Sequence, residues 1–356
     1  MEKGIYLKVT EQLRKGRFSV LATIIQQAGP SPRGLGTKFL ILDDGSFVGT
    51  IGGGLLEART LEGAKKVFDT RLPLRLHFSL KGSDVAETDM LCGGEVQVFL
   101  EPLLPDNPGL SSLCRELLSI TKRGGVGLVA TRLDPESWQH SQVPKILLEK
   151  EGQRFGSAPG EAALEATLLG DMEQILASRL PVILTFEEGG SKAEVFVEPV
   201  ISDPALFIFG GGHVSGEIVP LASLVGFKVV VIDDRREFAK TEQFPQAGEV
   251  YQYPFEGVMD RLAVDESSYI VIVTRGHIHD NIVLEQSLRT KAGYIGMIGS
   301  RRKRNIIYEN LLEQGFTHED LSRVHSPIGL DIGAETPEEI AVSIVAELIQ
   351  VRAEKD

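Results

Sequence analysis

The segment from residue 205 to residue 234 constrains the fold of this chain more than any other. Ala205–Phe209 has the apolar pattern of a buried strand and runs directly into Gly210-Gly211-Gly212-His213. A helical pattern follows over Val214–Val225, and the next apolar run, Lys228–Ile232, ends at an acidic pair. Strand, glycine turn, helix, strand and acid in this order are typical of a Rossmann-type doubly wound parallel sheet.

The acidic pair is Asp233-Asp234. Asp233 lies 23 residues after Gly210, which is the spacing of a carboxylate that binds the ribose 2′-hydroxyl of a dinucleotide. The third glycine of the fingerprint is replaced by Ser215, with Gly216 one position later. Because this fold hosts many ligands, the pattern predicts the fold and leaves a dinucleotide such as NAD(P) as one option among several.

Two later strands of this half also run into polar loops. Tyr269–Val273 precedes a segment with Arg275 and His277, and Tyr294–Ile298 precedes Ser300 and the cationic run 301–304. The carboxyl ends of strands in such a sheet line the ligand crevice. Four cations at a helix start oppose the helix dipole, so we expect some of them to point at phosphates; a solvated basic turn is the alternative interpretation. The candidate cofactor contacts of this half are Gly210, Gly212, His213, Asp233, Asp234, Arg275, His277, Ser300, Arg301 and Arg302.

The first two hundred residues contain an internal repeat. Three pairs of segments carry it: Lys15–Thr23 with Arg123–Thr131, Arg71-Leu72-Pro73 with Arg179-Leu180-Pro181, and Val98–Pro102 with Val195–Pro199. We therefore predict an α/β fold with an N-terminal α/β domain over residues 1–200, built from two related units at about 13–102 and 121–199. The Rossmann-like domain occupies residues 205–356.

Three glycine-rich segments occur only in the first unit. They are Gly29–Gly34, Gly52-Gly53-Gly54 and Asp89–Gly94. Since the second unit folds without them, we interpret them as functional, with tight turns as the alternative. We expect the amides of the glycine triplet, at the start of a helix, to be bare and to face an anion, although Glu57 in the first turn would either favour the dipole or repel that anion. The candidate cofactor contacts here are Ser31, Arg33, Gly52, Gly53, Gly54, Gly93 and Gly94, with Cys92 as a candidate reactive thiol.

Composition narrows the function further. Acidic residues outnumber basic ones 50 to 37, and a net charge of −13 repels a nucleic-acid backbone. The longest apolar runs have the length of strands, far short of a membrane span. Only two cysteines occur, so nothing requires an oxidising compartment. We therefore expect a cytoplasmic protein that binds neither nucleic acid nor membrane. We also expect no metal site, because His213, His277 and His279 lack the spacing of zinc ligands.

Taken in order, the motifs resemble those of the XdhC/CoxI family, the accessory factors of xanthine dehydrogenase and related molybdenum hydroxylases. The resemblance covers nearly the whole chain. The motifs that carry it are Gly29–Gly34, Ile51–Gly54 with Glu57, Leu91–Gly94, Gly210–Val214, Val231–Arg235, Thr274–His277 with Asp280, Ile298–Lys303 and Pro327–Leu330.

This resemblance implies a chaperone that binds the pyranopterin molybdenum cofactor, with or without a nucleotide extension, and protects it. It implies that the bound cofactor receives a sulfido ligand from a cysteine desulfurase before insertion into an apo hydroxylase of the xanthine dehydrogenase type. Cys92 would then lie near the molybdenum or the incoming sulfur. We expect an accessory factor rather than an enzyme with turnover, and a homodimer, in which a cofactor could sit between subunits.

Two other functions fit parts of the sequence. An NAD(P)-dependent oxidoreductase would use the Rossmann half, but no Lys-Tyr pair or similar proton relay stands out in the N-terminal half. A nucleotide-sensing scaffold would contact the hydroxylase without carrying cofactor. Binding of NADH distinguishes the first from a carrier, and co-elution with pyranopterin cofactor distinguishes the second.

Overall fold

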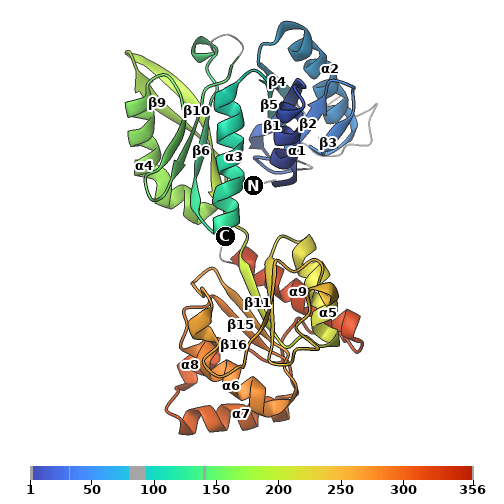
Figure 1. The fold of residues 1–356 in the computed structure, drawn as a ribbon. Helices are drawn as coiled ribbons and strands as arrows, with labels where there is room; N and C mark the ends of the chain where they lie inside the picture. The colour runs from blue at the N-terminus through green and yellow to red at the C-terminus, as the bar shows by residue number, and fades with distance from the viewer. Residues whose placement is uncertain (1–2, 32, 80–93, 139–141, 355–356) are drawn as a thin grey trace. The chain divides into compact units, whose positions relative to one another are not determined.

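A computed structural model describes residues 3–354 except residue 32, residues 80–93 and residues 139–141 (Figure 1). The chain divides into two compact units, Met1–Ser202 and Asp203–Asp356, and each is considered by itself. Within the described ranges, no helix is both long enough and apolar enough to cross a membrane.

The first half of the N-terminal unit forms an antiparallel sheet of five strands in the order β3-β2-β1-β5-β4. The turn at Asp43-Asp44-Gly45 joins β2 to β3 as the hairpin signal predicts, with the amide of Leu42 donating to the carbonyl of Ser46. The elements are α1 (Lys3–Arg14), β1 (Ser19–Ala28), β2 (Lys38–Leu42), β3 (Phe47–Gly49), α2 (Gly54–Thr70), β4 (Leu74–Ser79) and β5 (Glu95–Leu103).

The second half repeats this arrangement. Its sheet has the order β8-β7-β6-β10-β9 and is also antiparallel throughout, so each strand has a counterpart in the first half. The elements are α3 (Pro108–Arg123), β6 (Val126–Arg132), the 3₁₀ turn η2 (Pro135–Ser137), β7 (Lys145–Glu149), β8 (Arg154–Ser157), α4 (Glu161–Ser178), β9 (Val182–Glu188) and β10 (Ser191–Ile201).

The repeated Arg-Leu-Pro segments are helix stops. Arg71 ends α2 and Arg179 ends α4, both in the left-handed conformation with φ of 58° and 53°. In each case the amide of the arginine donates to a carbonyl of the last helical turn, and a proline two residues later cannot continue the helix. The repeat in sequence therefore reflects the same backbone geometry in both halves.

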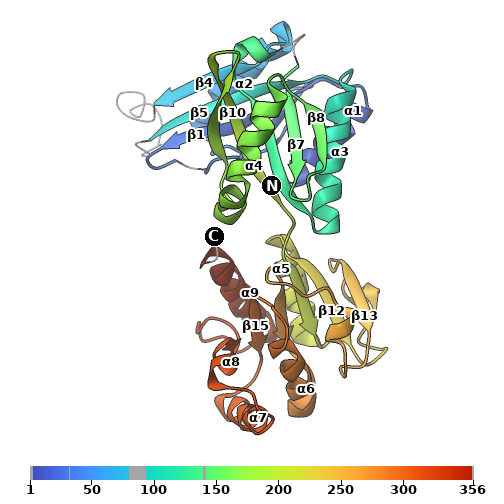
Figure 2. The same ribbon diagram turned by 90° about the vertical axis from the view of Figure 1, so that its left-hand side faces the viewer.

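The unit is layered around its two sheets. Helix α2 covers one face of the first sheet and α4 covers one face of the second (Figures 1 and 2). Helices α1 and α3 pack against each other, and a shared core joins them to residues of both sheets, such as Leu40 and Leu147. The two halves are thus one packed body.

Two buried ion pairs join the halves reciprocally. Lys38 of the first half reaches Glu198 of the second, with 2.6 Å between Nζ and Oε1. Lys145 of the second half reaches Glu101 of the first, with 2.9 Å between Nζ and Oε2. Lys38 and Lys145 are equivalent positions of the repeat, and so are the two glutamates. Each half therefore supplies the counter-charge that the other half needs.

All four side chains are at most 12% exposed. Thr23 and Thr131, again equivalent positions, accept a hydrogen bond from Lys38 and Lys145 respectively. Complete burial raises the pKa of Glu101 even though Lys145 opposes the shift. A charge buried this deeply is costly unless it is paired, so the halves have to stay together.

The C-terminal unit is a six-stranded parallel sheet in the order β13-β12-β11-β14-β15-β16, as predicted for a Rossmann-type fold. Its elements are β11 (Ala205–Phe209), α5 (His213–Leu224), β12 (Lys228–Asp233), η3 (Thr241–Gln243), β13 (Glu249–Gln252), η4 (Met259–Arg261), β14 (Tyr269–Ile272), α6 (Gly276–Leu288), β15 (Tyr294–Met297), α7 (Arg301–Glu313), α8 (His318–Ser322), β16 (Val324–His325) and α9 (Pro337–Glu354).

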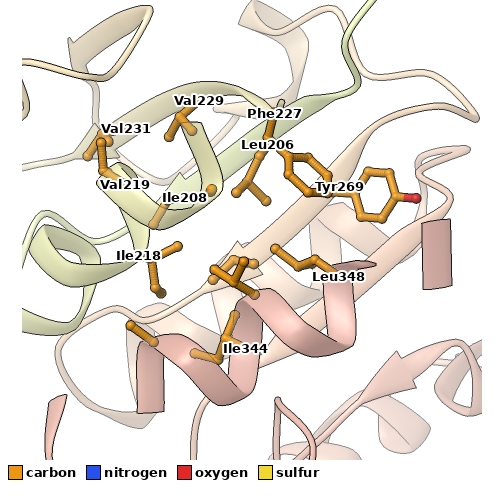
Figure 3. Close-up of a cluster of buried hydrophobic side chains, with 14 of the residues drawn as sticks. Leu206, Ile208, Ile218, Val219, Phe227, Val229, Val231, Tyr269, Ile344 and Leu348 are labelled. Carbon is orange, nitrogen blue, oxygen red and sulfur yellow. The ribbon is translucent and has the colours of Figure 1, made fainter. Parts of the chain in front are cut away.

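Alternate residues of the central strand enter two different cores. Leu206 and Ile208 of β11 pack with α5 and α9 (Figure 3), whereas Phe207 and Phe209 pack with α6 and α7 on the opposite face. The last helix begins with a capping box: Glu339 accepts from the amide of Thr336, and its own amide donates to the hydroxyl of Thr336. Both faces of the sheet are covered, which leaves the carboxyl edge of the strands for ligands.

We predict that Lys38→Met destabilises the N-terminal unit by about 3–5 kcal/mol, because Glu198 is left buried without its partner. The double variant Lys38→Met/Glu198→Met should cost clearly less, since no charge remains unpaired. Urea unfolding followed by the fluorescence of the single tryptophan, Trp138, measures both. Lys150→Met, which removes an exposed ion pair with Glu173, is the control and should change stability by about 0.5 kcal/mol or less. Equal losses for the two single variants would contradict the prediction.

Candidate functional site

Predicted segments of the N-terminal unit lie together. A Cβ added to Gly94 would sit 2.4 Å from the carbonyl oxygen of Pro30 and 2.7 Å from that of Ala28, so the backbone at the start of β5 presses on the turn after β1. The hydroxyl of Ser31 donates to the carbonyl of Arg33. Gly94 is therefore required for close packing of two backbone segments, and the side chain of Arg33 in this turn is exposed.

Arg33 also reaches the second motif. A cavity of about 280 Å³ is lined by Arg33, Thr37 and Thr50 together with residues of α1 and β3. Thr50 precedes Ile51 and the glycine triplet directly. The turn at Gly29–Gly34 and the loop before α2 therefore share one surface hollow.

The amides of Gly52 and Gly53 are not bare, which corrects the prediction for these two members of the glycine triplet: Gly52 donates to the hydroxyl of Thr50, and Gly53 donates to Glu57. The carboxylate of Glu57 accepts hydrogen bonds from the amides of Ile51 at 3.1 Å and Gly53 at 2.9 Å, and from the hydroxyl of Thr50. Partial burial would raise the pKa of Glu57, but these hydrogen bonds outweigh it and the pKa is lowered. Glu57 thus occupies the place that an anion would take at this helix start.

The two cysteines differ sharply. Cys92 and Gly93 lie outside the described residues, so their proposed roles stay predictions from sequence. Cys114 is buried in α3, and burial raises the pKa of its thiol to about 12. A thiol with this pKa stays protonated at neutral pH and is a poor nucleophile.

In the Rossmann unit the three glycines after β11 have different roles. A Cβ on Gly210, whose φ is 109°, would lie 2.5 Å from the carbonyl oxygen of Val273. A Cβ on Gly211 would lie 2.1 Å from the carbonyl oxygen of Phe238. Both positions are filled by the protein's own backbone. Gly212 has open space beside it and precedes α5 without any side-chain cap, so it is the glycine that a ligand could approach.

The two acidic residues after β12 also have different roles. Asp233 is buried: Oδ2 accepts from the amide of Gly211 at 2.8 Å, and both oxygens bind the Arg235 guanidinium at 3.0 Å. In this structure it holds the glycine loop, in place of the ribose contact that the spacing predicts. Asp234 is the more exposed carboxylate, and it forms a bidentate ion pair with Arg275. The hydrogen bonds from Arg275 lower the pKa of Asp234.

A buried ion pair links the next two loops. Lys303 in the first turn of α7 contacts Asp280 of α6, which is fully buried and also accepts from the hydroxyl of Thr274 at 2.6 Å. Burial raises the pKa of Asp280 despite both partners. The pair aligns the starts of α6 and α7. Lys303 belongs to the cationic run that the sequence assigns to phosphates, whereas Asp280 belongs to a family motif but not to the predicted contacts.

The cationic run at the start of α7 is only partly free. Lys303 is bound to Asp280, and Arg304 donates to the carbonyl of Ser326 at 3.0 Å. The side chain of Ser300 caps the helix by accepting from the amide of Lys303. Arg301 and Arg302 are exposed, and across the described ranges no hydrogen bond or ion pair holds them.

The predicted histidines are exposed at helix starts, His213 in α5 and His277 in α6. Among the residues that the structure describes, no group of three or more histidine, cysteine or carboxylate side chains is placed to hold a metal ion. His279 instead packs against Phe255, with 5.5 Å between ring centroids.

One feature was not anticipated from sequence. A cavity of about 610 Å³ lies in the second half of the N-terminal unit, where Gly156 and Ser157 occupy the places that Gly49 and Thr50 have in the first half. Lys145 lines it as well. The repeat comparison predicts functional segments only in the first half, because a comparison of motifs does not register a surface hollow.

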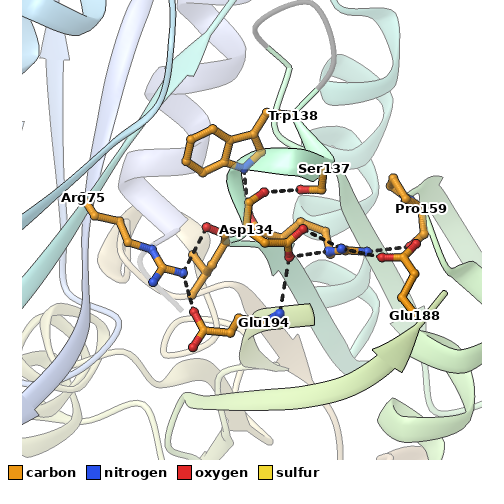
Figure 4. Close-up of polar contacts among 9 residues, drawn as sticks. Arg75, Asp134, Ser137, Trp138, Pro159, Glu188 and Glu194 are labelled. Carbon is orange, nitrogen blue, oxygen red and sulfur yellow. Dashed lines mark hydrogen bonds and ion pairs between the residues drawn. The ribbon is translucent and has the colours of Figure 1, made fainter. Parts of the chain in front are cut away.

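A polar network supports one wall of this cavity (Figure 4). Arg132 is almost fully buried and binds Asp134, Glu188 and the carbonyl of Pro159, with distances of 2.7 Å for the shortest contact to each. Arg75 of the first half donates to the carbonyl of Leu133 and to Glu194. Ser137 and Pro159, which line the cavity, are thereby held in place.

The chain matches two family models, one described as the XdhC and CoxI family over residues 12–79 and one described as the XdhC Rossmann domain over residues 206–348. The chain belongs to the XdhC/CoxI family. The resemblance seen in the sequence motifs is confirmed, and the matches cover parts of both structural units.

Three curated relatives align along nearly the whole chain. The uncharacterized protein YqeB of Escherichia coli (strain K12) is 24% identical over 93% of this chain, which spans only 43% of the length of YqeB. A probable xanthine dehydrogenase subunit of Bacillus subtilis (strain 168) is 26% identical, over 94% of this chain and 93% of its own length. The molybdenum cofactor insertion chaperone PaoD of Escherichia coli (strain K12) is 22% identical, over 97% and 87% respectively.

A solved structure shares the fold of the XdhC/CoxI chain described here. It is a crystal structure described as a xanthine dehydrogenase from Bacillus halodurans, with a TM-score of 0.77 and 26% sequence identity. The match covers 99% of this chain and 96% of that chain.

We predict opposite outcomes for two neighbouring glycine variants. Gly211→Ala should destabilise the C-terminal unit by about 1–3 kcal/mol, because the new methyl group would overlap the Phe238 carbonyl. Gly212→Ala should leave stability within about 0.5 kcal/mol, because its Cβ meets open space, yet it should weaken binding of inorganic pyrophosphate. Thermal unfolding and calorimetric titration measure the two effects. If Gly212→Ala were the more destabilising variant, the assignment of the two glycines would be wrong.

Proposed function

We propose that this protein is a cytoplasmic carrier of the pyranopterin molybdenum cofactor that protects it, supports its sulfuration by a cysteine desulfurase and inserts it into an apo hydroxylase of the xanthine dehydrogenase type. The observation that carries the proposal is family membership, together with an alignment to a relative named a molybdenum cofactor insertion chaperone over 97% of this chain. We further propose a homodimer as the working form.

The chemistry of the exposed groups fits such a cargo. The pyranopterin carries a phosphate, and phosphate is bound by helix N-termini and by guanidinium groups. In the Rossmann unit these are the uncapped start of α5 at Gly212 and the exposed Arg301 and Arg302. In the N-terminal unit Arg33 lines a hollow beside Thr50. The other predicted contacts remain part of the proposal, apart from Asp233, whose oxygens are already bound, and the amides of Gly52 and Gly53, which donate to Thr50 and Glu57.

A cargo carrier needs to hold a phosphorylated heterocycle without consuming it. Within the described residues the two units show structural ion pairs and exposed cations, and the one described thiol, Cys114, is protonated and buried. These features support binding and release more directly than turnover. The sulfur chemistry of the proposal rests on Cys92, which lies outside the described part of the chain.

The direct test is to identify what the protein carries. We expect protein purified from a host that makes the pyranopterin cofactor to release pterin and molybdenum on denaturation, measured by pterin fluorescence and elemental analysis. Protein from a host that lacks cofactor synthesis is the control and should release neither. Release of NAD(H) in place of pterin would instead support the oxidoreductase alternative, and release of neither from the first host would refute the carrier proposal.

We predict that Cys92→Ala lowers sulfuration of the carried cofactor severalfold, because the nucleophilic thiolate is lost. The readout is activity of a reconstituted hydroxylase with and without chemical sulfuration of the cofactor. Cys114→Ala is the matched control and should sulfurate normally, since burial keeps the Cys114 thiol protonated. Unchanged cofactor retention together with unchanged sulfuration in Cys92→Ala would remove this residue from the mechanism.

A further inference from the structure

The ion pair between Asp234 and Arg275 spans the ligand edge of the Rossmann sheet. Asp234 follows β12 and Arg275 follows β14, and these two strands are not neighbours because β11 lies between them. Two strand spacings amount to roughly 10 Å. The bidentate contact, with 2.6 Å and 2.8 Å between the paired atoms, therefore bridges the end of β11.

The glycine loop lies directly beneath this bridge. Gly211 donates to Asp233, the residue before Asp234. The Cβ position of Gly210 lies against Val273 and Thr274, the residues just before Arg275. The loop thus lies between the backbone segments that precede Asp234 and Arg275. Asp234 and Arg275 therefore flank the loop that leads to Gly212 and the start of α5.

Of the charged groups at this edge, the bridging pair is the one that a ligand can displace. Arg235 binds Asp233, and its guanidinium carbon lies 3.6 Å from the ring centroid of Phe238. Its Nε lies 3.9 Å from Oδ1 of Asp234, a longer contact than either bond between Asp234 and Arg275. By contrast the side chains of Arg275 and Asp234 are 43% and 21% exposed, and they meet only at their tips. An exposed pair of this kind contributes little net stability, so exchanging its partner costs little.

We propose that Asp234 and Arg275 form an exchangeable strap that selects ribonucleoside phosphates at the Rossmann edge. A ligand phosphate takes the Arg275 guanidinium, and the released Asp234 carboxylate accepts hydrogen bonds from the ribose hydroxyls. A phosphate without ribose would satisfy Arg275 but leave beside it the Asp234 carboxylate, whose remaining cationic neighbour, Arg235, lies 3.9 Å away and already binds Asp233. The strap therefore favours a phosphate attached to ribose over a bare phosphate. This inference rests on the proposed function only in taking the Rossmann edge as a ligand site.

The test compares ADP with inorganic pyrophosphate by calorimetric titration of the full-length protein. In Asp234→Asn the strap is open and the repelling charge is gone, so pyrophosphate should bind about tenfold more tightly. ADP should gain much less, because its ribose loses a charged acceptor, and the preference for ADP over pyrophosphate should fall about tenfold. Arg275→Gln should weaken both ligands about tenfold.

Glu237→Gln is the matched control, since it removes the same charge from the same exposed loop without releasing Arg275. It should leave the preference for ADP unchanged. A gain for pyrophosphate in Asp234→Asn no larger than in Glu237→Gln would reduce the effect to net charge and overturn the strap. Failure of both probes to bind wild type and Asp234→Asn alike would also overturn it.

These outcomes are separable from those of the carrier proposal. Protein that releases pterin and molybdenum but ignores both probes retains its carrier function without a strap. Protein that shows the predicted change in preference but never carries cofactor retains the strap and loses the carrier function.

Discussion

Two lysines buried between the halves of the N-terminal unit set a condition that the rest of that unit has to meet. Lys38 and Lys145 are removed from water, and each finds its carboxylate on the other half. A buried ammonium group without a partner is strongly destabilising. Because the carboxylate that pairs with each lysine lies on the other half, neither half alone can pair its own lysine. The reciprocal exchange makes the duplicated sequence one folded body. It also holds the two hairpins, and the hollows beside them, at equivalent places in the two sheets.

Close contacts between backbone segments explain why several positions are glycine. Gly94, Gly210 and Gly211 all lie where a methyl group would strike a backbone carbonyl of the protein itself. Gly212 differs, because open space lies beside it. A glycine-rich loop thus serves two purposes at once: most of its members permit backbone segments to pack, and one leaves room for a ligand. The close packing of Gly210 and Gly211 fixes the position of Gly212 beside them.

The charged side chains at the Rossmann edge also differ in how they are bound. The pair of Asp280 with Lys303 is buried and aligns two helices, whereas the pair of Asp234 with Arg275 is exposed and bridges the glycine loop. Arg301 and Arg302 are bound to nothing in the described part of the chain. Structural, exchangeable and free cations therefore lie along one edge. This arrangement suits the carrier role proposed for this protein, in which an anionic ligand is bound and later released.

The sequence by itself determined the elements and their type, because periodicity and turn residues are local properties. The strand Ala205–Phe209 and the helix that follows it are where the pattern predicted them, with ends within one residue. The order of the motifs also indicated the family.

Only the tertiary structure decided which polar groups remain available to a ligand. Asp233 and Asp234 are adjacent and chemically identical, yet one is consumed by Gly211 and Arg235 while the other faces Arg275. Likewise Glu57 accepts from the amide of Gly53, which the glycine triplet was expected to offer to a ligand. Some of these pairings join residues that are distant in sequence, and others depend on the direction in which a side chain points. A local sequence pattern specifies neither.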